Sequence, residues 1–386
     1  MKKISTLYIT LCLLWIALFK IYLIPKNLQQ MIKIIAILII TLFIIKNIKL
    51  KKNLINRKIL FWCFIIIISS IWGNIKGYIV FDNVLNSILH AICIYYIFVL
   101  IEYSKEHNKI DEVLKSLIFI LIIYNSISIL TIIAFGYNAE AAIIYFLGDK
   151  FRTSYYFIML CAVIICLYNK KIQKNLILKF FYFILIVGVI FICSYMKCST
   201  TVIGATAFLI LYIIPKKYKN ILCKKETILI ILVLSAIIIF GFNYVLSFDI
   251  VRYIIVNVLH ENINLTGRMH IYSFLIEVLK QSLIIGHGYG NYAVGNASGF
   301  GNAQNAIFQI LIDYGVIGLL IFLKFFYECI KNNNVNSKNW GMYMYLIISL
   351  VCSSVEISFN YLFYISLIFI YVYDYKELKQ EEKINE

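Results

Sequence analysis

Apolar segments recur along almost the whole chain, and many reach the length of about 20 residues that a helix needs to cross a membrane. Hydrophobic residues make up 62% of the 386-residue sequence and charged residues only 14%. A soluble protein of this size would need more polar side chains to cover its surface. The sequence therefore predicts an all-α fold, a polytopic membrane helix bundle of about 12 transmembrane helices. The expected spans are residues 4–24, 31–45, 59–74, 84–101, 116–136, 153–168, 176–194, 199–214, 227–246, 305–323, 340–356 and 360–373.

The distribution of positive charge predicts the side of the membrane on which each connection lies. With Lys2 and Lys3 in the cytoplasm, 26 of the 36 Lys and Arg residues fall on that side, including clusters at 46–58, 170–179 and 216–225. This is the positive-inside pattern of membrane proteins, so we expect both termini to be cytoplasmic. Topology and contact with anionic membrane lipids explain the net charge of +17, and nucleic acid is not an expected partner.

Cysteine and carboxylate residues do not indicate a metal or cofactor site. The 10 cysteines are scattered through the spans without the short paired spacings of zinc sites. The predicted outer connections also lack a dense group of carboxylates. We therefore expect neither a metal ion nor a cofactor.

Two connections on the predicted outer side are much longer than a simple turn. We interpret residues 1–386 as a single membrane domain, in which residues 247–304 form one large extracytoplasmic loop between the ninth and tenth spans. Residues 137–155 join the fifth and sixth spans and place Lys150 and Arg152 at the outer face. Long ordered connections usually carry function, so we expect the substrate to bind between these two segments.

The large loop contains the pattern of an amphipathic helix that begins after Thr266, a plausible N-cap. Polar residues on one face oppose an apolar face made of Ile271, Phe274, Leu275, Val278 and Leu279. Arg268 falls at the edge of the apolar face, although a cation in the first turn is unfavourable for the helix dipole. We infer that the helix lies over the membrane domain and turns Arg268 towards it.

The arginines of the two long connections have two interpretations. Arg268 could extend to lipid phosphates, as long basic side chains do at membrane interfaces. Alternatively, Arg268 and Arg152 hold an anionic substrate, because a guanidinium group binds phosphate or carboxylate through paired hydrogen bonds. A diphosphate or an acidic sugar would fit between them. Lys150 and Arg252 are weaker candidates for the same role.

The tenth span opens with polar side chains, in the stretch FGNAQNAIFQILIDYGVIGLLIFL at 300–323. Gln304 and Asn305 stand at its outer end, and Asp313 lies about two turns deeper. An ionisable residue inside a span usually faces the bundle interior or a watery cavity. Gly315 and Gly318 could let another helix approach closely.

Three motifs within residues 266–323 resemble the O-antigen ligase and polysaccharide polymerase family, the bacterial Wzy and WaaL type. Gly267-Arg268 opens a loop helix, and the segment Gly286-His287-Gly288 follows about twenty residues later. Gln304-Asn305 then precedes nine residues and a Gly-x-x-Gly motif that begins at Gly315. The rest of the chain resembles the family in the layout of its spans.

The resemblance implies a metal-independent glycosyltransferase at the outer face of the bacterial cytoplasmic membrane. It would join oligosaccharide repeat units carried on undecaprenyl diphosphate, as donor and as acceptor, into O-antigen, capsular or exopolysaccharide. Arg268 and Arg152 would stabilise the departing diphosphate, and a chain-length regulator and a flippase are the expected protein partners. The other candidate site residues are His287 as a base, Gln304 to orient the acceptor hydroxyl, and Asn305, Lys150, Arg252 and Asp313 as substrate contacts.

Two alternatives to a polymerase remain open. Gln304 stands where ligase-type members carry a histidine, and glutamine cannot take up a proton at physiological pH, which favours a polymerase over a ligase of the same fold. A flippase for lipid-linked oligosaccharides would also have twelve spans with both ends inside. Transporters are typically built from two repeated halves, however, and residues 1–190 show no convincing repeat in residues 191–386.

Overall fold

The computed structural model describes residues 5–47, 54–136, 144–245, 248–253, 256–257, 268–331 and 338–385. These residues form α-helices without a β-strand, which confirms the all-α prediction. The helices are α1 Thr6–Leu18, α2 Lys26–Asn47, α3 Leu54–Ile75, α4 Phe81–Glu106, α5 Ile110–Phe135, α6 Lys150–Lys174, α7 Leu176–Tyr195, α8 Ser199–Ile213, α9 Lys216–Leu222, α10 Lys225–Val245, α11 Asp249–Tyr253, α12 Arg268–Gln281, α13 Ala293–Ser298, α14 Ala306–Ile330, α15 Trp340–Cys352 and α16 Tyr361–Asn385.

Each of the twelve expected spans coincides with one of these helices. Within the described residues, seven helices are long and apolar enough to cross a membrane, namely those at Lys26–Asn47, Arg57–Ile75, Phe81–Glu106, Ile110–Phe135, Lys150–Lys174, Leu176–Tyr195 and Ala306–Ile330. Four further apolar helices are shorter: Thr6–Leu18, Ser199–Ile213, Trp340–Cys352 and Tyr361–Tyr373. The chain therefore has several candidate membrane spans, and the total of twelve stays a prediction.

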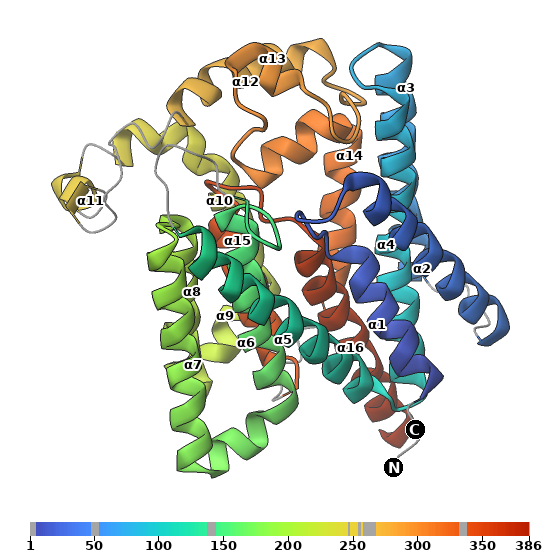
Figure 1. Cartoon of the computed structure of the whole chain (residues 1–386), viewed down its shortest axis with the longest axis vertical. Helices are drawn as coiled ribbons and strands as arrows, with labels where there is room; N and C mark the ends of the chain where they lie inside the picture. Colours follow the sequence, from blue (N-terminus) through green and yellow to red (C-terminus); the bar gives the residue numbers. More distant parts are fainter. Residues whose placement is uncertain are drawn as a thin grey trace.

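The long helices lie side by side in one bundle that joins segments distant in the sequence (Figure 1). Helix α14 packs against α3, α16 against α4, and α15 against α6. Glycine allows the closest of these approaches, because a Cβ atom at Gly341 of α15 would overlap the backbone oxygen of Ala162 in α6. The outward faces are apolar, and Leu42, Ile45 and Phe191 are all exposed, as expected for side chains that face lipid.

Helices α12 and α13 lie across one end of the bundle, above the start of α14 (Figure 1). Ile271, Leu275 and Val278 of α12 are buried in a small separate core together with Val294 and Ile312, whereas the polar face of α12 is exposed. The predicted amphipathic helix is thus confirmed, including the direction of its apolar face. The location of residues 247–304 on the extracytoplasmic side of the membrane stays a prediction.

Helix α14 is broken in its middle, at Gly315, where φ is 67° and ψ is −172°. Only glycine adopts this backbone conformation without strain. A Cβ atom at Gly315 would also overlap the carbonyl group of Ile284, in the connection between α12 and α13. Gly315 therefore accommodates a non-helical segment, which corrects our expectation that a helix approaches there. Gly318, in contrast, does lie against Ile65 of α3.

Residues 283–288 replace the hydrogen bonds that α14 loses at this break. The backbone N–H groups of His287 and Gly288 each donate to a carbonyl of α14, at Ile312 and Asp313, over 2.8 Å. In the opposite direction, the N–H of Val316 donates to the carbonyl of Leu283, also over 2.8 Å. Non-helical backbone at membrane depth requires such partners, because lipid offers none. The break is therefore closed by protein backbone and fixes the position of Asp313.

Candidate active site

A cavity of about 530 Å³ lies where several helices and the connections between them meet. Its walls come from α1, the α1–α2 connection, α2, α4, the start of α6, the segments on either side of α13, α14, the α15–α16 connection and the start of α16. The charged side chains of the wall are four cations, Lys20, Lys26, Lys33 and Arg152, and three carboxylates, Asp149, Asp313 and Glu356. Tyrosine and amide side chains supply much of the rest, a combination suited to a ligand that has both charged and sugar-like parts.

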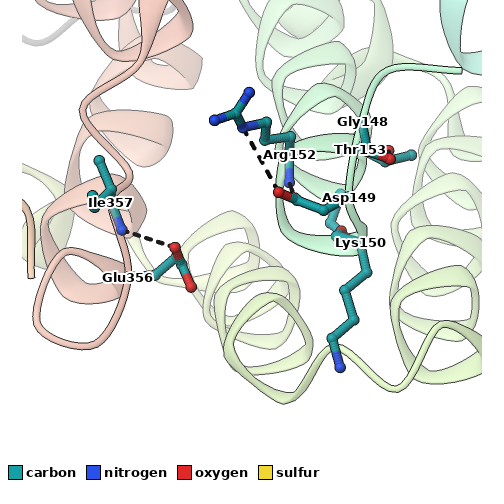
Figure 2. Close-up of polar contacts among 8 residues, drawn as sticks. Gly148, Asp149, Lys150, Arg152, Thr153, Glu356 and Ile357 are labelled. Carbon is teal, nitrogen blue, oxygen red and sulfur yellow. Dashed lines mark hydrogen bonds and ion pairs between the residues drawn. The ribbon is translucent and has the colours of Figure 1, made fainter. Parts of the chain in front are cut away.

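Arg152 reaches the cavity from the first turn of α6 (Figure 2). The turn is fixed by Asp149, the N-cap residue, whose carboxylate accepts a hydrogen bond from the N–H of Arg152 over 2.8 Å. The same carboxylate lies 3.8 Å from Nε of Arg152. This geometry uses the Nε side of the guanidinium and directs its other end towards the cavity.

Lys20 and Tyr22 bring the α1–α2 connection next to Arg152. The Lys20 ammonium group lies 4.2 Å from the centre of the Tyr22 ring, and the Arg152 guanidinium carbon lies 5.3 Å from the same centre. Partial burial lowers the pKa of Lys20, and the positive charges of Arg152 and Lys26 lower it further. Three cations are thus close enough to repel each other at one side of the cavity.

A second wall is built from aromatic rings on α4, α16 and the segment before α13. The His90 ring stacks on Tyr289 with 4.8 Å between centroids, and its Nδ1 is hydrogen-bonded to the hydroxyl of Tyr361 over 2.8 Å. The ammonium group of Lys33 lies 5.7 Å from the centre of the Tyr361 ring. Flat aromatic surfaces of this kind suit the apolar faces of sugar rings.

Asp313 forms the deep acidic part of the cavity and is only 9% exposed. Its Oδ1 accepts one hydrogen bond from Asn291 Nδ2 and one from Gln309 Nε2, each over 2.7 Å. Gln309 is itself held by the N–H of Ala303, and Asn291 by the N–H of Ala293. The two amides fix the orientation of the carboxylate. The cavity reaches the Asp313 carboxylate.

Glu356 is a second buried carboxylate of the wall, 7% exposed, at the end of α15. Its Oε1 accepts a hydrogen bond from the N–H of Ile357 over 3.1 Å. Figure 2 shows this contact, and Glu356 and Arg152 both line the cavity. Glu356 ends the predicted span 340–356 and was not among the predicted site residues.

Comparison with known proteins finds one matching protein family. A family model described as O-Antigen ligase matches residues 180–323. The match, over less than half of the chain, supports the O-antigen polymerase and ligase family. It includes all three motifs on which the resemblance was based, and comparisons with curated protein sequences and with solved structures found no match. The family comprises membrane enzymes that process glycans and implies lipid-linked glycan substrates.

Two polar residues of the family motif lie at the start of α14, outside the cavity wall. Asn305 is fully buried and caps α14, since its Oδ1 accepts from the N–H groups of Ile307 and Phe308 over 3.1 Å. Its Nδ2 donates to the carbonyl of Ser235 in α10 over 2.9 Å. Gln304 has a left-handed backbone, with φ of 49°. Their roles at the substrate stay predictions, whereas Asn305 has a visible role in fixing α14.

His287, another polar residue of the motifs, is fully buried beside the break in α14. Its Nδ1 is hydrogen-bonded to the carbonyl of Ile312 over 3.2 Å, and the Tyr78 ring lies 4.6 Å from its own ring. Burial lowers the pKa of His287, although the Ile312 contact opposes this shift. Its Nε2 has no hydrogen-bond partner in the described part of the chain. His287 does not belong to the cavity wall, and its proposed role as a base stays a prediction.

The remaining predicted cations are placed differently. Lys150 turns away from Arg152 (Figure 2), and its Nζ donates to the carbonyl of Lys197 over 2.8 Å. Arg252 is exposed on α11, which projects from the bundle in Figure 1, and is not in the cavity wall. Arg268 is the first residue of α12, but its side chain lies outside the described part of the structure, as do Thr266 and Gly267.

Lys20, Lys26 and Lys33 are three cations of the cavity wall that were not among the predicted site residues. They belong to the ten Lys and Arg residues that fall outside the predicted cytoplasmic segments. A cation on the outer side departs from the positive-inside pattern and therefore calls for another reason to be there. This departure is the signal that could have identified them.

Proposed function

We propose that the protein is a glycosyltransferase that polymerises undecaprenyl-diphosphate-linked oligosaccharides at the outer face of the bacterial cytoplasmic membrane. The observation that carries the proposal is the single cavity that combines the Arg152 guanidinium with the buried carboxylate of Asp313. The family match supports the substrate class, because it implies lipid-linked glycans. The products would be O-antigen, capsular or exopolysaccharide.

The proposed reaction is a displacement at the anomeric carbon of the donor. The acceptor hydroxyl forms a bond to this carbon, and the bond from the carbon to the phosphate oxygen breaks with its electron pair on the lipid diphosphate. Cations next to the leaving group stabilise the charge that develops there. Arg152 has this role in the proposal, together with Arg268 from α12.

The proton of the acceptor hydroxyl needs a destination. Asp313 is the best-placed group in the proposal because it lines the cavity and two amides hold its carboxylate in one orientation. Positioning of the hydroxyl would contribute as well, since attack on an oxocarbenium-like carbon benefits strongly from alignment. The proposal needs no metal ion for either step.

A ligase of the same fold is the second candidate, because the matching family model is described as O-Antigen ligase. A ligase would transfer finished polymer from its lipid carrier to another acceptor, and the same cavity chemistry would serve. Gln304 at the position of the ligase histidine is the sequence feature that favours the polymerase.

The distinguishing experiment is analysis of glycan products in a host that lacks this gene and carries either the wild type or Arg152→Ala. Loss of long polymer with single units still displayed supports the polymerase. Intact polymer that stays on its lipid carrier supports the ligase, and a wild-type pattern from Arg152→Ala contradicts both. Single-cysteine labelling within 268–304 tests the predicted outer location, and co-purification tests a chain-length regulator and a flippase as partners.

A further inference from the structure

The α1–α2 connection is attached to the connection that precedes α6. The N–H of Tyr22 donates to the carbonyl of Phe146 over 2.9 Å. Gly148 lies directly against the Tyr22 ring, since a Cβ atom there would be 2.9 Å from Cε2 of Tyr22. Gly148 has φ of +119°, so glycine is favoured for two reasons at this position. The two segments therefore hold Tyr22 in a defined place.

Tyr22 in turn places two cations of different chemistry next to each other. Lys20 and Arg152 both contact its ring, and a cation over an aromatic face is attracted to it. Lysine offers a compact point charge, whereas arginine offers a flat fork of donors. The arrangement presents two neighbouring positive groups to the same cavity.

The charge around Lys20 is not balanced by a carboxylate partner. Within the described part of the chain, no acidic side chain forms an ion pair with Lys20, and Asp149 pairs with Arg152. The other charged groups of the wall are Lys26 and Lys33 on α2, Asp313 on α14 and Glu356 after α15. Burial lowers the pKa of Lys20, and the positive charges of Arg152 and Lys26 lower it further, so an anion bound beside these groups would favour the charged form of Lys20.

We infer that Lys20 and Arg152, both held close to the Tyr22 ring, form the subsite for the two phosphates of the lipid-linked donor. This inference rests on the proposed function and adds an N-terminal lysine to its leaving-group site. Two neighbouring cations in one cavity offer one positive group to each phosphate of a diphosphate. Lys20 would thus select a diphosphate over a monophosphate carrier.

The test uses the purified full-length protein in lipid nanodiscs and two probes without sugars, undecaprenyl diphosphate and undecaprenyl monophosphate. The measured quantity is the ratio of their dissociation constants, which does not depend on the fraction of protein that is folded. The wild type is expected to prefer the diphosphate, and Lys20→Ala to lose about tenfold or more of that preference. Lys20→Arg, which keeps the charge, is expected to retain most of it.

The matched control is Lys76→Ala, because Lys76 also lies over an aromatic ring, 4.8 Å from the centre of Trp72, but outside the cavity. It is expected to keep the wild-type ratio. An unchanged ratio in Lys20→Ala, with a wild-type protein that does prefer the diphosphate, would overturn the inference and leave the proposed function intact. A wild type that binds neither probe and makes no polymer would instead refute the proposed function itself.

Discussion

Lys150 and Arg152 leave the first turn of α6 in opposite directions, although only one residue separates them (Figure 2). The Lys150 ammonium group donates to the carbonyl of Lys197, in the connection between α7 and α8, whereas the Arg152 guanidinium lines the cavity. Residues two apart on a helix point about 200° apart, so the two charges face different surroundings. Replacing each residue in turn therefore compares the loss of one positive charge at two positions, of which only one faces the cavity.

Arg152→Ala is expected to abolish long-chain polymer, because it removes the cation proposed to stabilise the leaving diphosphate, with a loss of at least about 100-fold in rate. Lys150→Ala, its neighbour, is expected to keep the wild-type polymer length. Gel analysis of glycan ladders at matched protein levels measures both. Equal effects from the two substitutions would show that the orientation of Arg152 does not matter.

Asp313→Asn is expected to reduce polymer formation by about 100-fold or more, since the amide keeps the shape of the carboxylate but cannot take up a proton. Gln309→Ala removes one of its two hydrogen-bond donors and is expected to cost about tenfold. Gln281→Ala, an exposed amide on α12, is the control and should behave as the wild type. Initial rates of polymer formation in membranes provide the measurement, and full activity of Asp313→Asn would remove it from the mechanism.

Gly315→Ala is expected to destabilise the protein by about 2 to 6 kcal/mol, because the methyl group overlaps the carbonyl of Ile284 and the backbone conformation is strained for alanine. Gly301→Ala is the control, since no atom lies within 4 Å of its Cβ position. Thermal unfolding in detergent compares the two variants. A Gly315→Ala protein as stable as Gly301→Ala would contradict the close contact at the break in α14.

Stability is expected to fall as the pH drops below about 6.5, the ordinary pKa of histidine, in part because of His287. Burial lowers its pKa in the folded protein, so the unfolded chain takes up the proton first and acid favours unfolding. His287→Gln should remove about 1 kcal/mol of the stability difference between pH 7.5 and 5.5. His270→Gln, at an exposed position, is the control. Unfolding temperatures at both pH values measure the effect, and a wild-type pH response in His287→Gln would count against it.

Several features of the fold follow from local sequence patterns, and the structure agrees with them. Each expected span lies on a helix because an apolar run of sufficient length has few other ways to satisfy its backbone in a membrane. The apolar face of α12 is buried as its helical periodicity predicts. The start of α14 follows from Asn305, because asparagine is a favourable N-cap residue.

The glycine-rich segment before α13 shows where local patterns are insufficient. Glycine in such a segment allows tight turns and close approaches of the backbone, but the local sequence does not say to which neighbour. In the structure, Gly286 and Gly288 lie tightly against backbone, at Asp313 in α14 and at Ser70 in α3. Glycine is needed because of neighbours that lie more than twenty residues away from Gly286 and more than two hundred residues away from Gly288. A local sequence pattern therefore cannot reveal this need.

The sequence by itself determined that this chain is a helical membrane bundle, where its helices lie, and which face of α12 is apolar, because these properties depend on composition and period along the chain. Only the tertiary structure decided which charges share a cavity. Lys20, Arg152, Asp313 and Glu356 come from four distant segments, and helix packing together with the break at Gly315 brings them to one wall. Charged residues can be counted in a sequence. The direction in which their side chains point is set by the packing of segments that are distant along the chain.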